Sequence, residues 1–192
     1  YGTIFGSEKV KKEISRLYAS ISPEEILTEH GATGGNQHIF FSLIRPGDRV
    51  IAFSPSYQQF YSAPEALGAE VTVLRLRREN GYLPDLDELS RAAARGVRMI
   101  CLNNPNNPTG DLLPRAFIEE VLKAADNIVF VDEAYMEFAQ KESVIDLIDI
   151  YPNLIVLRTL SKAFALAGMR CGYLAADEAL IEAIAKIKAP YN

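Results

Sequence analysis

Cysteine, histidine and tryptophan are scarce in this sequence, which has two cysteines, two histidines and no tryptophan. Cys101 and Cys171 each lie inside or beside an apolar run, and neither His30 nor His38 has metal-ligand spacing to them. Buried thiols of this kind are typical of a cytoplasmic protein rather than of a secreted, disulfide-bonded one. We therefore expect two free thiols, no metal site and a cytoplasmic location.

Positive charge and long apolar runs are also lacking. The 192 residues carry 20 lysines and arginines against 25 aspartates and glutamates, which gives a formal net charge of −5. Nucleic acids and anionic membranes bind basic faces, so neither is an expected partner. The apolar runs, such as residues 39–44, fall far short of the roughly 20 residues that span a bilayer, and no apolar signal-peptide core follows Lys9. The composition is that of a globular protein with one sizeable core.

Short apolar runs alternate along the chain with segments whose apolar residues recur every three or four positions. Near-continuous apolar runs are typical of strands that are covered on both faces of a parallel sheet. The predicted strands are residues 50–53, 71–74, 99–102, 128–131, 154–157 and 172–175. The predicted helices are residues 7–18, 39–44, 57–67, 86–94, 114–125, 142–150 and 178–188. This order predicts one three-layer α/β/α domain with a mostly parallel sheet.

Polar side chains follow several of these strands at the edge where such sheets bind ligands. Tyr57, Asn107, Asp132 and Lys162 all lie in loops after a predicted strand. Lysine forms Schiff bases with aldehydes, and removal from water or a nearby cation such as Arg170 favours its reactive neutral form. A buried carboxylate such as Asp132 needs a partner, and the protonated nitrogen of a pyridine ring would serve. Together these residues predict a site for pyridoxal 5′-phosphate.

Each of these side chains also has a simpler interpretation. Lys162 alone would be a solvated surface lysine, and Asp132 alone would be a cap of the following helix. Asp132 and Glu133 after an apolar strand also resemble the magnesium-binding carboxylate of ATPases, but the phosphate loop that such enzymes need is absent from the sequence. Tyr57 would stack on a flat ring, although tyrosines are more often packing residues.

Two further segments support a site for a phosphorylated ring. The small residues G-A-T-G-G at 31–35 precede a predicted helix, where free N–H groups and the helix dipole favour a phosphate. Thr159 and Arg170 would add a hydroxyl and a guanidinium to the same phosphate. The asparagine- and proline-rich loop at 103–110 is more elaborate than a turn requires and offers amide donors in a rigid frame.

At this point the chain resembles the large domain of the fold-type I, class I and II aminotransferases. The resemblance is carried, in the family's order, by Tyr1-Gly2 with Gly6, G-A-T at 31–33, P-G-D at 46–48, P-S-Y at 55–57, N-P-N-N-P-T-G at 104–110, V-D-E-A-Y at 131–135 and S-K at 161–162. Residues 132–192 most resemble the histidinol-phosphate aminotransferase branch, whereas Thr33-Gly34-Gly35-Asn36 resembles a less specialised branch.

The resemblance implies a role for each matching residue. The catalytic residues would be Lys162, as the Schiff-base and proton-transfer lysine, with Asp132 at the pyridine nitrogen and Tyr135 at the phenolic oxygen. Cofactor binding would further involve Asn107 at the phenolic oxygen, Tyr57 stacked on the ring, and Ala32, Thr33, Thr159 and Arg170 around the phosphate. Tyr1 matches a tyrosine that reaches the phosphate of the neighbouring subunit, which implies a homodimer. The implied reaction moves an amino group between an amino acid or amino-alcohol phosphate and a 2-oxo acid, in amino-acid biosynthesis.

The chain also departs from the family pattern. Ala165 stands where the histidinol-phosphate branch usually has glycine, and members of the family are about twice as long. We therefore expect residues 1–192 to be the cofactor-binding large domain of a longer protein, without an N-terminal arm and without the small domain that supplies the arginine for the substrate carboxylate. Two alternatives to transamination stay open: other chemistry with the same cofactor, namely elimination, cyclisation or racemisation, and a truncated scaffold without turnover.

Overall fold

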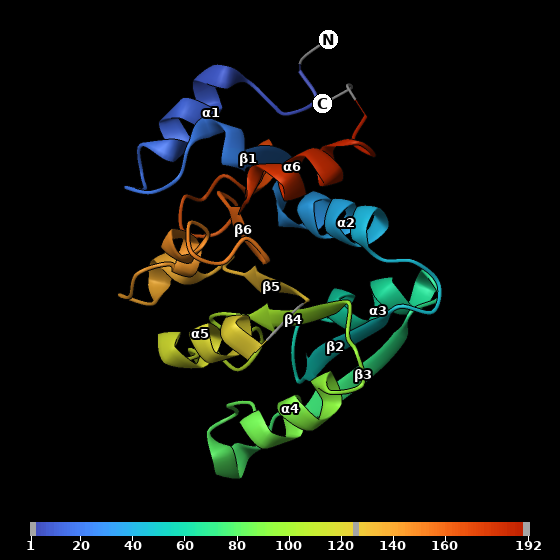
Figure 1. Cartoon of the computed structure of the whole chain (residues 1–192). Helices are drawn as coiled ribbons and strands as arrows, with labels where there is room; N and C mark the ends of the chain where they lie inside the picture. The colour runs from blue at the N-terminus through green and yellow to red at the C-terminus, as the bar shows by residue number, and fades with distance from the viewer. Residues whose placement is uncertain (1–2, 125–126, 190–192) are drawn as a thin grey trace.

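The chain folds around a seven-stranded sheet. In the computed structural model, which describes residues 3–124 and 127–189, the strand order is β1-β7-β6-β5-β4-β2-β3 (Figure 1). Strands β3, β2, β4, β5 and β6 are parallel to one another, whereas β7 is antiparallel to both of its neighbours. The strands are β1 (Ile26–His30), β2 (Arg49–Ser54), β3 (Glu70–Arg75), β4 (Met99–Asn103), β5 (Ile128–Asp132), β6 (Leu154–Thr159) and β7 (Cys171–Ala176).

Helices cover both faces of this sheet. The α-helices are α1 (Glu8–Ser15), α2 (Gly31–Leu43), α3 (Gln59–Ala66), α4 (Leu86–Ala93), α5 (Arg115–Ala124) and α6 (Glu178–Ala185). Short 3-10 helices are η1 (Pro23–Glu25), η2 (Arg78–Asn80), η3 (Met136–Phe138), η4 (Val144–Leu147) and η5 (Ala167–Met169). Figure 1 shows α2, α3 and α6 on one side of the sheet and α4 and α5 on the other. The three-layer α/β/α fold expected from the sequence is confirmed.

The two faces of the sheet have separate apolar cores, because successive residues of a strand point to opposite sides. In β5, Val129 and Val131 pack with α5 and η4, whereas Ile128 and Phe130 pack with α2, α3 and α6. Phe130 is fully buried and meets the rings of Phe40 and Phe60 edge to face. Burial on both faces explains why the central strands are almost entirely apolar.

All six predicted strands are present, and the structure adds β1 at the edge of the sheet beside β7. The sequence of β1 did not predict a strand because Thr28, Glu29 and His30 follow only two apolar residues. Glu29 is nevertheless buried, with 4% of its surface exposed, and its Oε2 is hydrogen-bonded to His38 Nδ1 at 2.8 Å. A buried polar residue with a specific partner therefore interrupts the apolar pattern.

Two helix predictions need correction. Within residues 142–150 the structure has the 3-10 helix η4 instead of an α-helix, with a bond over three residues from Ile148 N to Ile145 O at 3.2 Å. Side chains cap its start: Glu133 Oε1 accepts from Val144 N at 2.9 Å, and Ser143 Oγ accepts from Ile145 N at 3.1 Å. Helix α2 begins at Gly31, well before residue 39. The glycine-rich segment is therefore the first part of the helix and not a loop before it.

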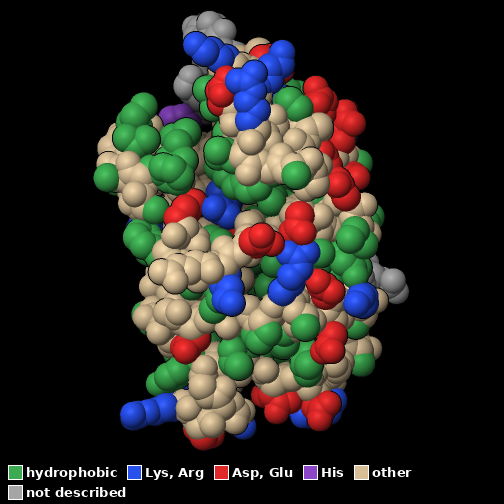
Figure 2. Space-filling view, turned by 90° about the vertical axis from the view of Figure 1, so that its left-hand side faces the viewer, with side chains coloured by type: hydrophobic (Ala, Val, Ile, Leu, Met, Phe, Trp, Pro, Cys, Tyr) green, Lys and Arg blue, Asp and Glu red, His purple; other side chains and the backbone are tan. Residues whose placement is uncertain are grey.

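The surface that carries α1 and α5 has acidic, basic and apolar side chains interspersed (Figure 2). Surface ion pairs such as Arg115 Nη2 to Asp146 Oδ2, at 2.7 Å, contribute to this mixture. Within residues 3–124 and 127–189, no helix has the length and apolar character needed to cross a membrane. The same residues contain no group of three or more histidine, cysteine or acidic side chains placed to hold a metal ion.

Candidate active site

A cavity of about 150 Å³ lies at the carboxyl ends of β4, β5 and β6, beside the start of α2. Its walls are formed by Ala32, Thr33, Tyr57, Asn103, Asn107, Asp132, Ala134, Tyr135, Thr159, Ser161, Lys162 and Arg170. The structure thus brings every predicted site residue into one cavity except Tyr1, which lies outside the described residues. Asn103, Ala134 and Ser161 were not chosen from the sequence as site residues.

Asp132 is the buried acid of this cavity. It ends β5 with 3% of its surface exposed, and its Oδ1 accepts a hydrogen bond from Ala134 N at 2.9 Å. Burial raises the pKa of Asp132 to about 6, and this rise is opposed by the Ala134 N–H, the Asn36 amide and the positive charge of Lys162. A carboxyl group in this state gains much from a cationic partner within the cavity.

The asparagine loop after β4 is tied to Asp132 through the backbone. Asn104 N and Asn103 Nδ2 both donate to the carbonyl oxygen of Asp132, at 2.9 and 3.2 Å. Asn103 Oδ1 in turn accepts from Asn107 N at 2.7 Å, which places Asn107 on the wall of the cavity. The buried asparagines of this segment therefore fix the loop and leave Asn107 to face the cavity.

Tyr57 reaches the same cavity from the loop between β2 and α3. Its ring meets Phe60 edge to face, with 5.7 Å between centroids. Asn106 Nδ2 donates to Pro55 O at 3.0 Å and so joins this loop to the asparagine loop. The ring contact with Phe60 and the hydrogen bond to Pro55 O thus fix the loop that carries Tyr57 at the cavity wall.

Lys162 follows β6 in the loop that ends at β7. Its Nζ lies 5.2 Å from the ring centroid of Tyr135, a cation–π distance. The side chain is exposed in this chain, so the expectation that Lys162 is removed from water is wrong for this structure. The loop lies at the surface beyond the strand ends, where the neighbouring Phe164 and Met169 are also exposed, at 48% and 70%.

The other end of the cavity is rich in hydrogen-bond donors. Helix α2 directs its first backbone N–H groups there, next to the Arg170 guanidinium, and Arg170 Nη2 donates to His30 O at 3.4 Å. Gly31 makes room for the guanidinium, since a Cβ at Gly31 would lie 2.5 Å from Arg170 Nη2. Thr159 Oγ1 and Ser161 Oγ, 3.0 Å apart, add hydroxyl groups. Such a group of donors suits an anion.

Comparison with known proteins identifies the family of this chain. A family model described as aminotransferase class I and II matches residues 1–192. The chain belongs to the class I and II aminotransferase family. It is 42% identical over 176 residues to a histidinol-phosphate aminotransferase of Shewanella oneidensis, covering 91% of this chain and 44% of that protein. Over 177 residues it is 40% identical to the same enzyme of Vibrio cholerae, covering 91% and 50%.

Solved aminotransferase structures share the fold. A PLP-dependent aminotransferase from Streptococcus suis superposes with a TM-score of 0.90 at 40% identity, over 97% of this chain and 50% of that one. BacF of Bacillus subtilis gives 0.89 at 30% identity, over 97% and 50%. The chain spans about half the length of the curated relatives it matches.

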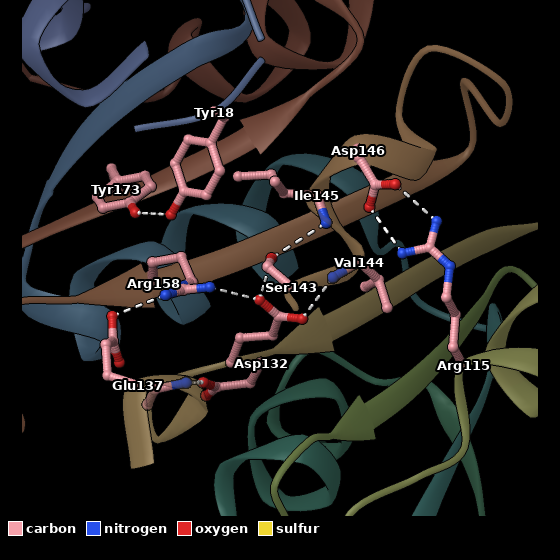
Figure 3. A network of polar contacts seen from close by, with 12 residues as sticks. Tyr18, Arg115, Asp132, Glu137, Ser143, Val144, Ile145, Asp146, Arg158 and Tyr173 are labelled. Atoms are coloured by element: carbon pink, nitrogen blue, oxygen red, sulfur yellow. Dashed lines mark hydrogen bonds and ion pairs between the residues drawn. The ribbon is translucent and has the colours of Figure 1, made fainter. Parts of the chain in front are cut away.

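Behind the cavity, on the opposite face of the sheet, the chain buries an ion-pair network (Figure 3). Arg158 Nη1 contacts Glu133 Oε2 and Arg158 Nη2 contacts Glu137 Oε1, each at 2.7 Å. Burial raises the pKa of Glu133, and Arg158 opposes the rise. The hydroxyls of Tyr18 and Tyr173 hydrogen-bond to each other beside Arg158, whose guanidinium carbon lies 6.0 Å from the Tyr18 ring centroid.

The network was not predicted from the sequence, although its members adjoin predicted site residues. Glu133 follows Asp132, and Arg158 precedes Thr159. Consecutive residues at a strand end face opposite sides of the sheet, so one member of each pair reaches the cavity and the other reaches the network. An arginine inside an apolar strand and an acid after the neighbouring strand were the signal in the sequence.

Proposed function

We propose that the cavity binds pyridoxal 5′-phosphate and that the protein is an aminotransferase. The observation that carries the proposal is the presence of Lys162 and Asp132 on the walls of one cavity, with Tyr57 and Asn107 beside them and the start of α2 at one end. The amine suits an aldehyde, the buried acid suits a pyridine nitrogen, and the donors around α2 suit a phosphate. The Streptococcus suis structure, described as PLP-dependent, shares this fold.

The residues present fit this cofactor at each of its functional groups. Ala32 and Thr33 backbone N–H groups, Thr159 and Arg170 would hold the phosphate, and Ser161 joins this set because its hydroxyl lies beside that of Thr159. Tyr57 would stack on the ring. Asn107 and Tyr135 would donate hydrogen bonds to the phenolic oxygen.

The chemistry divides between the cofactor and two side chains. When bound, the cofactor supplies an aldehyde and an electron-withdrawing ring. Asp132 holds a proton at the ring nitrogen, because an ionised carboxylate in a buried site favours a cationic partner. Lys162 moves a proton at the substrate Cα, since its amine reaches the cavity from the loop after β6. Asp132 and Lys162 thus act at opposite ends of the reacting system.

We infer the substrates from the relatives. The curated relatives named above are histidinol-phosphate aminotransferases, so we propose an amino-alcohol phosphate or an amino acid as donor and a 2-oxo acid as acceptor. We further propose that residues 1–192 are the cofactor-binding large domain of a cytoplasmic homodimer, in which Tyr1 of one subunit reaches the phosphate of the other.

The cofactor proposal is tested by adding pyridoxal phosphate to the purified chain. We expect an absorbance band at the boundary between the near-ultraviolet and the visible range. Reduction with borohydride should attach the cofactor covalently to the peptide that contains Lys162. Lys162→Ala should lose both signals, whereas Lys12→Ala, at an exposed position of α1, should keep them. A wild-type chain without the band, or a fixed cofactor on another lysine, refutes the proposal.

The reaction is tested separately by product analysis. Histidinol phosphate, aromatic amino acids and aspartate are supplied as donors with 2-oxoglutarate as acceptor. Glutamate formed in step with loss of the donor supports transamination. Elimination or racemisation products without glutamate, in a chain that binds the cofactor, would replace transamination by another reaction at the same site.

A further inference from the structure

Asn36 is a buried amide that none of the predicted site roles uses. Only 1% of its surface is exposed, and neither Nδ2 nor Oδ1 makes a well-formed hydrogen bond with the residues that the structure describes. A buried amide whose hydrogen bonds are poorly formed costs free energy, so its presence calls for an explanation. The position of the side chain indicates that use.

The helix geometry directs Asn36 toward the cavity. Ala32, on the first turn of α2, lines the cavity. Residues four apart on a helix share a face, so Asn36 points the same way one turn further along, behind the lining residues. Asn36 thus approaches the cavity from the floor and not from the open side.

The packing of α2 brings this face close to Asp132. A Cβ at Gly35 would lie 2.6 Å from Leu157 Cδ1, so the helix sits tightly against β6 at this point. Leu157 is the register partner of Asp132 in the β5–β6 pair. The residue after Gly35 is therefore held beside the strand end that carries the buried acid.

We propose that Asn36 is a positioning residue for the cofactor, whose side-chain amide donates to the carboxylate of Asp132 and holds it charged and oriented toward the pyridine nitrogen. This role rests on the proposed cofactor site. The Ala134 N–H occupies Asp132 Oδ1 from the backbone side, and the Asn36 amide approaches from α2. In agreement, the Asn36 amide lowers the pKa of Asp132 against the effect of burial. Asn36 acts through Asp132 and does not itself line the cavity.

The first test measures the charge of Asp132 without any cofactor. Carboxyl-carbon NMR of the labelled 192-residue chain, with Asp132→Asn to assign the resonance, gives the pH midpoint of Asp132. Asn36→Leu removes the amide at nearly constant volume, and we expect the midpoint to rise by roughly one pH unit. Asn36→Ser keeps a donor and should titrate between the two. Gln37→Leu, at the exposed neighbouring position, should match the wild type.

An unchanged midpoint in a folded Asn36→Leu variant overturns the proposal. If that variant does not fold, Asn36→Ala takes its place, since it adds no new atoms to the site, and the same rise is required of it. Thermal unfolding of each variant establishes that the chain is folded before titration. A destabilised chain with the wild-type midpoint would mean that Asn36 only packs.

The second test measures cofactor binding at about pH 5 and about pH 7. If the midpoint of Asp132 moves from about 6 to about 7, the ionised fraction falls about tenfold at about pH 5 but only about twofold at about pH 7. We expect Asn36→Leu to weaken pyridoxal phosphate binding by these factors, and Gln37→Leu to leave it unchanged. Failure of the wild-type chain to bind the cofactor would refute the proposed function, while the NMR titration would still answer whether Asn36 sets the charge of Asp132. Normal wild-type binding with an unchanged midpoint in Asn36→Leu would refute only the role of Asn36.

Discussion

Asp132→Asn is expected to stabilise the chain in the absence of cofactor. Burial raises the pKa of Asp132 from 3.8 to about 6, so the folded chain binds this proton more tightly than the unfolded chain. The stability contributed by Asp132 is therefore highest in acid and falls as the pH rises from about 4 to about 6. At about 1.4 kcal/mol per pH unit, the loss reaches roughly 3 kcal/mol above pH 6. Asparagine removes the charge and keeps an oxygen that can accept from Ala134 N.

Urea unfolding of the two proteins, without cofactor, measures this difference across the pH range. We expect the variant to be more stable by roughly 3 kcal/mol at about pH 8 and equal to the wild type near pH 4. Asp149→Asn, at an exposed position, should show no such pH-dependent gain. A variant that is less stable than the wild type at high pH, or an advantage that does not change with pH, would refute the reasoning that the fold holds this carboxylate at a cost in stability.

Two further predictions concern the loop and the network around the site. Ala165 has a φ of +53°, a left-handed conformation that glycine adopts without strain. We therefore expect Ala165→Gly to stabilise the chain by about 1 kcal/mol, as measured by urea unfolding. Equal or lower stability would show that the backbone is not strained at this position. Arg158→Met should lower the free energy of unfolding by roughly 3–5 kcal/mol because it leaves Glu133 buried without its charge partner. Arg115→Met, which breaks a surface pair with Asp146, should lower it by less than about 1 kcal/mol. Similar losses of stability in both variants would contradict this ranking.

The sequence predicts the central strands of this fold well, because their apolar runs record burial on two faces. It does not predict the direction of β7, since an apolar run has no information about which way a strand points. The sequence does not predict strand β1, because Glu29, which is buried against His38, interrupts its apolar run. The sequence also does not show that Glu133 caps the start of the 3-10 helix at residues 144–147, because the acid precedes the N–H group that it binds by a whole loop.

The main residues of the candidate site could be predicted because the same apolar runs mark where each strand ends. Asn107, Asp132 and Lys162 stand out because they are polar residues at the end of an apolar run or in the loop that follows one. Asn36 and Arg158 do not stand out. The orientation of Asn36 toward the cavity can be inferred only once α2 is known to start at Gly31. The ion pair of Arg158 can be inferred only once its strand is known to lie beside the strand that leads to Glu133.

Consecutive residues at the ends of β5 and β6 point to opposite faces of the sheet, so the face that lines the cavity (the front) and the face that carries the ion-pair network (the rear) can change separately. The ion pair between Glu133 and Arg158 joins the two strand ends on the face opposite the cavity. Substitutions among the front residues then alter which small molecule is accepted without shifting one strand past the other. A protein built this way can diversify its chemistry while the frame that spaces the reacting groups stays constant.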